Sequence, residues 1–280
     1  MSPLRFFTLL FFLATAVLGF WLGKEDCNKT IPTACAQEDT QLNESQSFVI
    51  FVHAFNQELW CERSLRSIFE QEYENYRVII IDDASSDETY ETMRRFLLEN
   101  HQEYRAILIR NETKIGPIAS LYRAIDSCLD REIIVPLEGK DWLVHPMVLS
   151  DLSKNYQNPN IWLSFGQAVH YPSYDLLEPQ LVSSKRKRKV NPAAPCSFYA
   201  GLFKKIPLSD LFKEGAEDSY LIPLLQMAGD RVQIIKEPIA FLNASTVPAI
   251  IPSLLEFSPD PPLAQFPKSG ELEEKVVASF

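Results

Sequence analysis

The sequence is poor in glycine, and its glycines lie far apart. There are nine, and no two of them are separated by two or by five positions. The G-x-G-x-x-G fingerprint of dinucleotide-binding folds and the G-x-x-x-x-G-K-[ST] motif of the P-loop both need such spacings. The sequence therefore excludes these two kinds of nucleotide site.

Histidine and cysteine are also scarce. The four histidines form no H-E-x-x-H motif, and the five cysteines form no C-x-x-C motif. Zincin, zinc-finger and thioredoxin interpretations are therefore unsupported. An odd number of cysteines without framework spacing does not indicate a redox compartment.

Basic residues are outnumbered, with 27 Lys and Arg against 37 Asp and Glu and a net charge of −10. Because this balance repels a phosphate backbone, we expect no nucleic-acid partner. The run Lys185–Lys189 is a local exception. It could contact an anionic partner, or it could be a solvated loop, which is the usual role of such a run.

What the chain does have is the composition of a folded globular protein, with 46% hydrophobic and 23% charged residues. It begins with an apolar segment, Phe6–Gly23, that contains no charged residue. This segment predicts a signal peptide or a signal-anchor. Charged residues follow it directly, and the small residues Ala34–Ala36 come too late for a cleavage site, so the anchor is favoured.

Arg5 precedes the apolar segment, and the positive-inside rule then keeps the N-terminus in the cytosol. We therefore expect a single-pass membrane protein with its domain on the non-cytoplasmic side, or a secreted protein if the segment is cleaved. Four N-x-[ST] tripeptides, at Asn28, Asn43, Asn111 and Asn243, fit such a location but also arise by chance.

Composition divides the chain into four parts. Residues 1–23 are the signal-anchor or signal peptide, residues 24–47 a polar stalk, residues 48–250 a folded domain and residues 251–280 a proline-rich tail.

Within the folded domain, short apolar runs alternate with segments of helical periodicity. The predicted strands are Phe48–Phe55, Arg77–Ile81, Ala106–Ile109 and Ile133–Leu137. The predicted helices are Leu59–Gln71, a segment with Tyr90, Met93 and Leu97 as its buried stripe, Ile118–Leu129 and Met147–Tyr156. This alternation predicts an α/β fold with a parallel sheet covered on both faces.

The alternation ends after Gln167. We expect Tyr171–Pro195 to be a loop or insertion, followed by a strand or packed segment at Phe198–Phe203, a helix at Tyr220–Ala228 and a strand at Gln233–Ile235.

Acidic residues follow two of the predicted strands. Asp82 and Asp83 come after the second strand, and Glu138 and Asp141 come after the fourth. Ligands of parallel sheets bind beyond the carboxyl ends of the strands. Carboxylates there can bind a base or ribose and can hold a divalent cation on a diphosphate. The alternative for Asp82–Asp87 is capping of the helix that follows.

Several segments, in order and spacing, resemble family 2 glycosyltransferases: Phe51–Gln57, Ile79–Thr89, Gly116–Ile125, Leu137–Leu143 and Trp162–Gln167. The resemblance covers about Phe48 to Asn243. It implies a GT-A fold, with a Rossmann-like, mostly parallel sheet flanked by helices. It also implies transfer of a sugar from a nucleotide-diphosphate donor, most commonly a UDP-sugar, to an acceptor hydroxyl with inversion. The acceptor could be a saccharide, a lipid or a protein.

The same resemblance assigns roles to individual residues. Asp83, with Asp82 beside it, resembles the carboxylate that binds the donor base, and His53 and Phe55 resemble the wall of the nucleotide site. Gly116 and Lys140 belong to the same site by resemblance. Asp141, with Glu138, resembles the ligands of a divalent cation, Mn²⁺ or Mg²⁺, on the diphosphate.

A late acidic motif supplies the expected general base. Asp218 resembles this base, with Glu217 as its competitor. A positioned carboxylate can take the proton of an acceptor hydroxyl as that hydroxyl attacks. The alternative for Asp218 is capping of the helix predicted at Tyr220.

One segment departs from the family. Where the family has Asp-Gly-Asp-Asp, this chain has Glu138–Asp141 with a lysine at position 140. An ammonium beside a diphosphate is a counter-charge, but it also repels a divalent cation. The alternative function is therefore a catalytically degenerate GT-A-fold binding or scaffolding protein.

Overall fold

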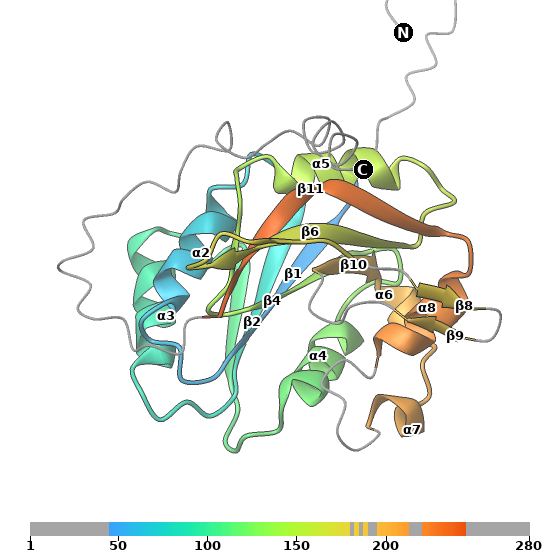
Figure 1. Cartoon of the computed structure of the whole chain (residues 1–280). Coiled ribbons are helices and arrows are strands. Elements are labelled where there is room, and N and C mark those ends of the chain that lie inside the picture. The colour runs from blue at the N-terminus through green and yellow to red at the C-terminus, as the bar shows by residue number, and fades with distance from the viewer. Residues whose placement is uncertain (1–44, 180–181, 185–186, 190–194, 213–219, 245–280) are drawn as a thin grey trace, which may run out of the picture. The chain divides into compact units, whose positions relative to one another are not determined.

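A computed structural model describes most of the predicted folded domain (Figure 1). It covers residues 45–179, 182–184, 187–189, 195–212 and 220–244, which belong to one compact unit beginning at Ser45. The predicted signal-anchor, the stalk up to residue 44, the proline-rich tail and both general-base candidates, Glu217 and Asp218, lie outside the described residues. Among the residues described, no helix has both the length and the apolar character that a membrane span needs.

The described part of the chain is built on a nine-stranded mixed sheet, in which eight strands follow the order β3-β2-β1-β4-β10-β6-β11-β5 and β7 pairs with β6. β1, β2, β3, β4, β6 and β11 run in one direction, and β5, β7 and β10 run against them. The strands are β1 (Phe48–Ala54), β2 (Tyr76–Asp82), β3 (Ala106–Arg110), β4 (Ile133–Glu138), β5 (Trp142–Leu143), β6 (Leu163–Tyr171), β7 (Leu176–Leu177), β10 (Cys196–Tyr199) and β11 (Val232–Asn243).

Alternate residues of β1 enter two separate cores, because successive side chains of a strand point to opposite faces of the sheet. Phe48 and Ile50 pack with residues of α2, α3 and α5, whereas Val49 and Phe51 pack with residues of α4, α6 and α8. Helices therefore cover both faces (Figure 1). The helices are α2 (Cys61–Phe69), α3 (Thr89–Glu99), α4 (Pro117–Asp126), α5 (Val148–Tyr156), α6 (Ala200–Phe203), α7 (Leu208–Leu211) and α8 (Leu221–Ala228).

The predicted α/β fold is confirmed. The first four strands and the helices α2, α4 and α5 lie within a few residues of their predicted bounds. Met93 and Leu97 are buried on α3 as predicted, whereas Tyr90 is only half-buried. The sheet is mostly parallel, as the resemblance implied, but it is mixed, because β5, β7 and β10 are antiparallel and β10 lies between β4 and β6. The predicted loop or insertion Tyr171–Pro195 contains β7 and a hairpin of β8 (Val182–Ser184) and β9 (Lys187–Lys189). The strand predicted at Gln233–Ile235 continues to Asn243, because a register shift accommodates Pro238.

The register of the sheet brings the predicted site residues to one edge. Ala54 pairs with Asp82 across β1 and β2, and His53 pairs with Glu138 across β1 and β4. The carboxyl ends of these three parallel strands thus place His53, Asp82 and Glu138 on neighbouring strands at the same edge.

Candidate functional site

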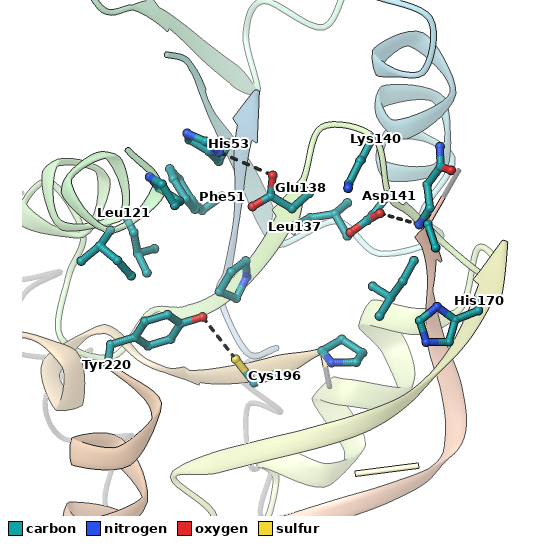
Figure 2. A pocket seen from close by; sticks show the side chains of 17 residues that line it. Phe51, His53, Leu121, Leu137, Glu138, Lys140, Asp141, His170, Cys196 and Tyr220 are labelled. Carbon is teal, nitrogen blue, oxygen red and sulfur yellow. Dashed lines mark hydrogen bonds and ion pairs between the residues drawn. The ribbon is translucent and has the colours of Figure 1, made fainter. Parts of the chain in front are cut away.

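A pocket of about 370 Å³ lies beside the carboxyl ends of β1 and β4 (Figure 2). Its polar wall contains His53, Glu138, Lys140, Asp141, His170 and Asn243. Its apolar wall includes Phe51, Ile118, Leu121, Pro136, Leu137 and Leu242, and Tyr220 and Cys196 also line it. A concave, mostly apolar space with a few converging polar groups is typical of a small-molecule site.

His53 stands between two carboxylates of this edge. Its Nε2 lies 3.4 Å from Oδ2 of Asp83, and its Nδ1 lies 3.5 Å from Oε2 of Glu138. Burial favours the neutral ring, but the hydrogen bonds and charges of Glu138 and Asp83 outweigh it and raise the pKa of His53. His53 therefore binds a proton more readily than a free imidazole does, and it lies between the two acidic groups.

Asp83 is fully buried and accepts hydrogen bonds from several donors. Its oxygens accept the backbone N–H groups of Ile115 and Gly116 and the amide of Asn111, each at 2.8 Å. Burial raises the pKa of a carboxyl group, but these hydrogen bonds outweigh it, so the pKa of Asp83 lies below its usual range. Asp83 does not itself line the pocket.

The bonds of Asp83 hold the entrance of α4 rather than that of α3. Gly116 has φ of 89° and ψ of 165°, a conformation that only glycine adopts readily, and it precedes the first residue of α4. At α3 it is Asp87 whose Oδ1 accepts the backbone N–H of Thr89, at 3.1 Å. The capping alternative for Asp82 and Asp83 is thus wrong for α3, and Asp83 anchors the loop before α4 instead.

Asp82 and Phe55 also lie outside the pocket wall. Asp82 is buried, its Oδ2 accepts the backbone N–H of Ser85 at 3.3 Å, and Nε of Arg110 lies 3.4 Å from the same oxygen. Phe55 stacks under the ammonium of Lys114, which lies 3.5 Å from the ring centroid. Both residues shape the outer part of this sheet edge.

The turn after β4 carries the other acidic group. The backbone N–H of Asp141 donates to the carbonyl of Glu138 at 2.9 Å, and the N–H of Gly139 donates to the carbonyl of His53 at 2.8 Å. A Cβ at Gly139 would lie 3.1 Å from Cβ of Ala54 and 3.3 Å from the carbonyl oxygen of His53. A larger residue at position 139 would therefore push the turn and β1 apart by a few tenths of an ångström.

Asp141 is buried, and few hydrogen bonds to its carboxylate offset the loss of water. Its Oδ1 accepts the backbone N–H of Asn243 at 2.7 Å, and its side chain is enclosed at the pocket wall. Burial, with a smaller contribution from the charge of Glu138, raises the pKa of Asp141 to about 7. A carboxyl group that titrates near neutral pH in a pocket is a candidate functional group.

These residues fit a protein-held divalent cation poorly. The described part of the chain contains no cluster of three or more His, Cys, Asp or Glu that could hold a metal ion. Figure 2 shows the Lys140 side chain between those of Glu138 and Asp141. An ammonium between two carboxylates competes with a divalent cation for them, and Glu138 also contacts His53.

The structure thus brings four of the predicted site residues into one pocket: His53, Glu138, Lys140 and Asp141. Sequence analysis missed Asn111, His170, Asn243 and Tyr220. Asn111 directly follows β3, so the rule that pointed to Asp82 and Glu138 could have found it. The other three lie on β6, at the end of β11 and before α8, where the apolar pattern gave no such signal.

Two of the four N-x-[ST] tripeptides are not available for modification in the folded domain. The amide of Asn111 donates to Asp83 and its oxygen accepts a bond from Arg123, and the Asn243 side chain is also buried. Asn28 and Asn43 lie outside the described residues.

An α/β domain with a pocket at the carboxyl edge of its sheet has the architecture of the broad class of proteins that bind ligands at strand ends. The chain belongs to glycosyl transferase family 2, whose family model matches residues 49–193. The predicted family is thereby confirmed.

Three further proteins are similar to the chain. It is 29% identical over 119 residues to the uncharacterized protein MT1568 of Mycobacterium tuberculosis, covering 41% of this chain and 34% of that protein. Its fold resembles S. aureus TarS 1-349 in complex with UDP-GlcNAc, with a TM-score of 0.58 and 14% identity over 72% of this chain and 60% of that one.

It also resembles the mannosyltransferase PcManGT of Pyrobaculum calidifontis in complex with GDP-Man and Mn²⁺, with a TM-score of 0.54 and 17% identity over 74% of this chain and 59% of that one. The chain thus spans about 60% of these two solved chains. At these identities the likeness concerns the fold, which is of the predicted GT-A type.

Proposed function

We propose that this protein is a glycosyltransferase that moves a sugar from a nucleotide-diphosphate donor to an acceptor hydroxyl with inversion. The observation that carries the proposal is the pocket of a family 2 domain that unites His53, Glu138, Lys140 and Asp141 at the carboxyl edge of the sheet. The two proteins of similar fold that are in complex with UDP-GlcNAc and with GDP-Man support a nucleotide-sugar donor.

In the proposed reaction the acceptor oxygen attacks the anomeric carbon of the donor sugar. A new carbon–oxygen bond forms on one face while the bond to the diphosphate breaks on the other, and its electron pair stays on the diphosphate oxygen. The hydroxyl proton passes to a carboxylate, for which we propose Asp218, with Glu217 as its alternative. A UDP-sugar is the proposed donor, and the acceptor is a saccharide, a lipid or a protein.

We further propose that residues 1–23 anchor the protein in a membrane, with residues 24–47 as a stalk and the domain on the non-cytoplasmic side. The apolar segment after Arg5 and the charged residues that follow it support this arrangement. Protease added to intact cells, or to sealed vesicles whose non-cytoplasmic side faces outward, should cut the stalk and leave the N-terminus protected. A mature chain that begins after residue 23 would instead indicate a cleaved signal.

Donor turnover tests the catalytic proposal. The full-length protein is incubated with UDP-GlcNAc and with GDP-mannose, and release of UDP or GDP is measured with and without candidate acceptors. Loss of the general base should lower the rate about 10²- to 10⁴-fold in Asp218→Asn, with donor binding retained. The matched control is Asp126→Asn, at an exposed position on α4.

A second function, a non-catalytic binding protein on the same fold, is favoured by one observation: Lys140 stands where the resembling family has an acid. The same assay separates the two functions. Binding of UDP or GDP without turnover of either sugar, in wild type and Asp218→Asn alike, would establish the binding protein.

A further inference from the structure

The pocket contains a positive charge, that of Lys140, which forms no hydrogen bond or close ion pair with the described residues, although it acts on Asp141 at longer range. Two lysines elsewhere in the domain differ from it. Nζ of Lys154 lies 2.7 Å from an oxygen of Asp151, and that of Lys204 lies 3.2 Å from one of Asp130.

The two carboxylates nearest in sequence to Lys140 are engaged elsewhere. Glu138 contacts the ring of His53 at 3.5 Å, and Asp141 accepts the backbone N–H of Asn243 at 2.7 Å. Figure 2 shows the Lys140 nitrogen on the side of the Asp141 carboxylate, and both residues line the pocket. An ammonium in a partly enclosed site gains most from an anion that enters that site.

We propose that Lys140 supplies the counter-charge to the diphosphate of the donor, so that the protein binds nucleoside diphosphates without a divalent cation. The proposal rests on the proposed function and departs from it in one respect: the Mn²⁺ or Mg²⁺ site expected from the resemblance is replaced by a side chain. The observed donor set supports this, because it offers two already engaged carboxylates and an ammonium between them.

The charge arithmetic is consistent with a side-chain counter-charge. A diphosphate needs positive charge close to its oxygens, and a lysine supplies one unit as a point charge with three N–H donors. A cation held by Glu138 and Asp141 would lie beside that ammonium and be repelled by it.

The test is calorimetric titration of the full-length protein with UDP and with GDP, first in EDTA and then in Mn²⁺. We expect binding in EDTA and less than about a threefold gain in affinity on adding Mn²⁺. Lys140→Ala should weaken diphosphate binding about tenfold to a hundredfold, as expected for loss of a charge-assisted hydrogen bond. Lys140→Arg should keep most of the affinity, and the matched control Lys154→Ala should keep all of it.

Uridine, which lacks the phosphates, separates a phosphate contact from a folding defect. Its affinity should be the same for wild type and Lys140→Ala. Equal losses for uridine and UDP would overturn the proposed role of Lys140. Binding of UDP or GDP only in Mn²⁺ would overturn the metal-free inference and leave the proposed function standing. Absence of binding under both conditions would overturn the proposed function and this inference together.

Discussion

Asp83 and Asp141 are buried carboxyl groups near the same edge of the sheet, yet folding shifts their pKa values in opposite directions. The pKa of Asp83 lies below its usual range, and that of Asp141 is raised to about 7. Burial acts on both in the same direction. The difference comes from the donors, because Asp83 accepts three hydrogen bonds at 2.8 Å and also contacts His53, whereas Asp141 accepts one from Asn243.

This difference separates a carboxylate whose charge the fold stabilises from one whose charge the fold disfavours. Asp83 uses its charge to fix the loop before α4, which forms one wall of the pocket. Asp141 lies at the pocket wall, where burial disfavours its ionised form. Buried groups with strongly shifted pKa values concentrate at functional sites, where a bound ligand can supply the hydrogen bonds or opposite charge that the fold does not provide.

The largest expected effect on the free energy of unfolding is that of Asp83→Asn. In Asp83→Asn an NH2 group replaces one acceptor oxygen and faces donors that it cannot pair with. This change should lower the free energy of unfolding at pH 7 by about 3–5 kcal/mol. Because the pKa of Asp83 is lowered by folding, its stabilisation is present above the unfolded value near 4 and is lost as pH falls through the folded value. The loss in the variant should therefore shrink in acid.

Urea unfolding followed by circular dichroism at pH 7 and at successively lower pH measures this loss. Asp126→Asn, an exposed control on α4, should change the free energy of unfolding by less than about 0.5 kcal/mol. A loss below about 1 kcal/mol in Asp83→Asn would mean that its hydrogen bonds are not what holds the loop.

The equivalent substitution at Asp141 should have the opposite effect and stabilise the fold. Asp141→Asn keeps an oxygen for the N–H of Asn243 but removes the buried charge, and it should raise the free energy of unfolding by about 2–4 kcal/mol at pH 8. Because folding raises this pKa from 3.8 to about 7, the penalty in the wild type develops as pH rises from about 4 to 7 and is absent below that window.

Thermal melts of wild type and Asp141→Asn at pH 4 and pH 8 check this sign. The two proteins should melt together at pH 4 and separate at pH 8, with the variant more stable. Equal melting at both pH values would show that Asp141 ionises in the fold without penalty.

The sequence allowed the sheet edge to be predicted because its signals are local. Continuous apolar runs marked β1, β2 and β4, and the acids directly after β2 and β4 marked their carboxyl ends. Strand β5 has only two residues, so it has no run long enough to be recognised. Only the part of β11 before the bulge at Pro238 was predicted, as Gln233–Ile235.

The role of Asp83 was beyond sequence reasoning for a different reason. Its main donors are backbone N–H groups 32 and 33 positions further along the chain, and every residue type except proline carries such a group. The engagement of Glu138 with His53 likewise depends on the register of β1 against β4.

The smallest expected effect concerns Gly116 and tests whether the anchor acts through backbone geometry. A Cβ at position 116 would meet no atom within 4 Å, so Gly116→Ala should cost only the strain of φ at 89°, about 1–3 kcal/mol in urea unfolding. Because Gly116 and Asp83 fix the same loop, the double variant with Asp83→Asn should lose less than the sum of the two single losses. In the control, the double variant of Gly116→Ala with Asp141→Asn, the two changes in the free energy of unfolding should add within about 0.5 kcal/mol. Additivity in both pairs would show that Asp83 stabilises the fold by some route other than the entrance of α4.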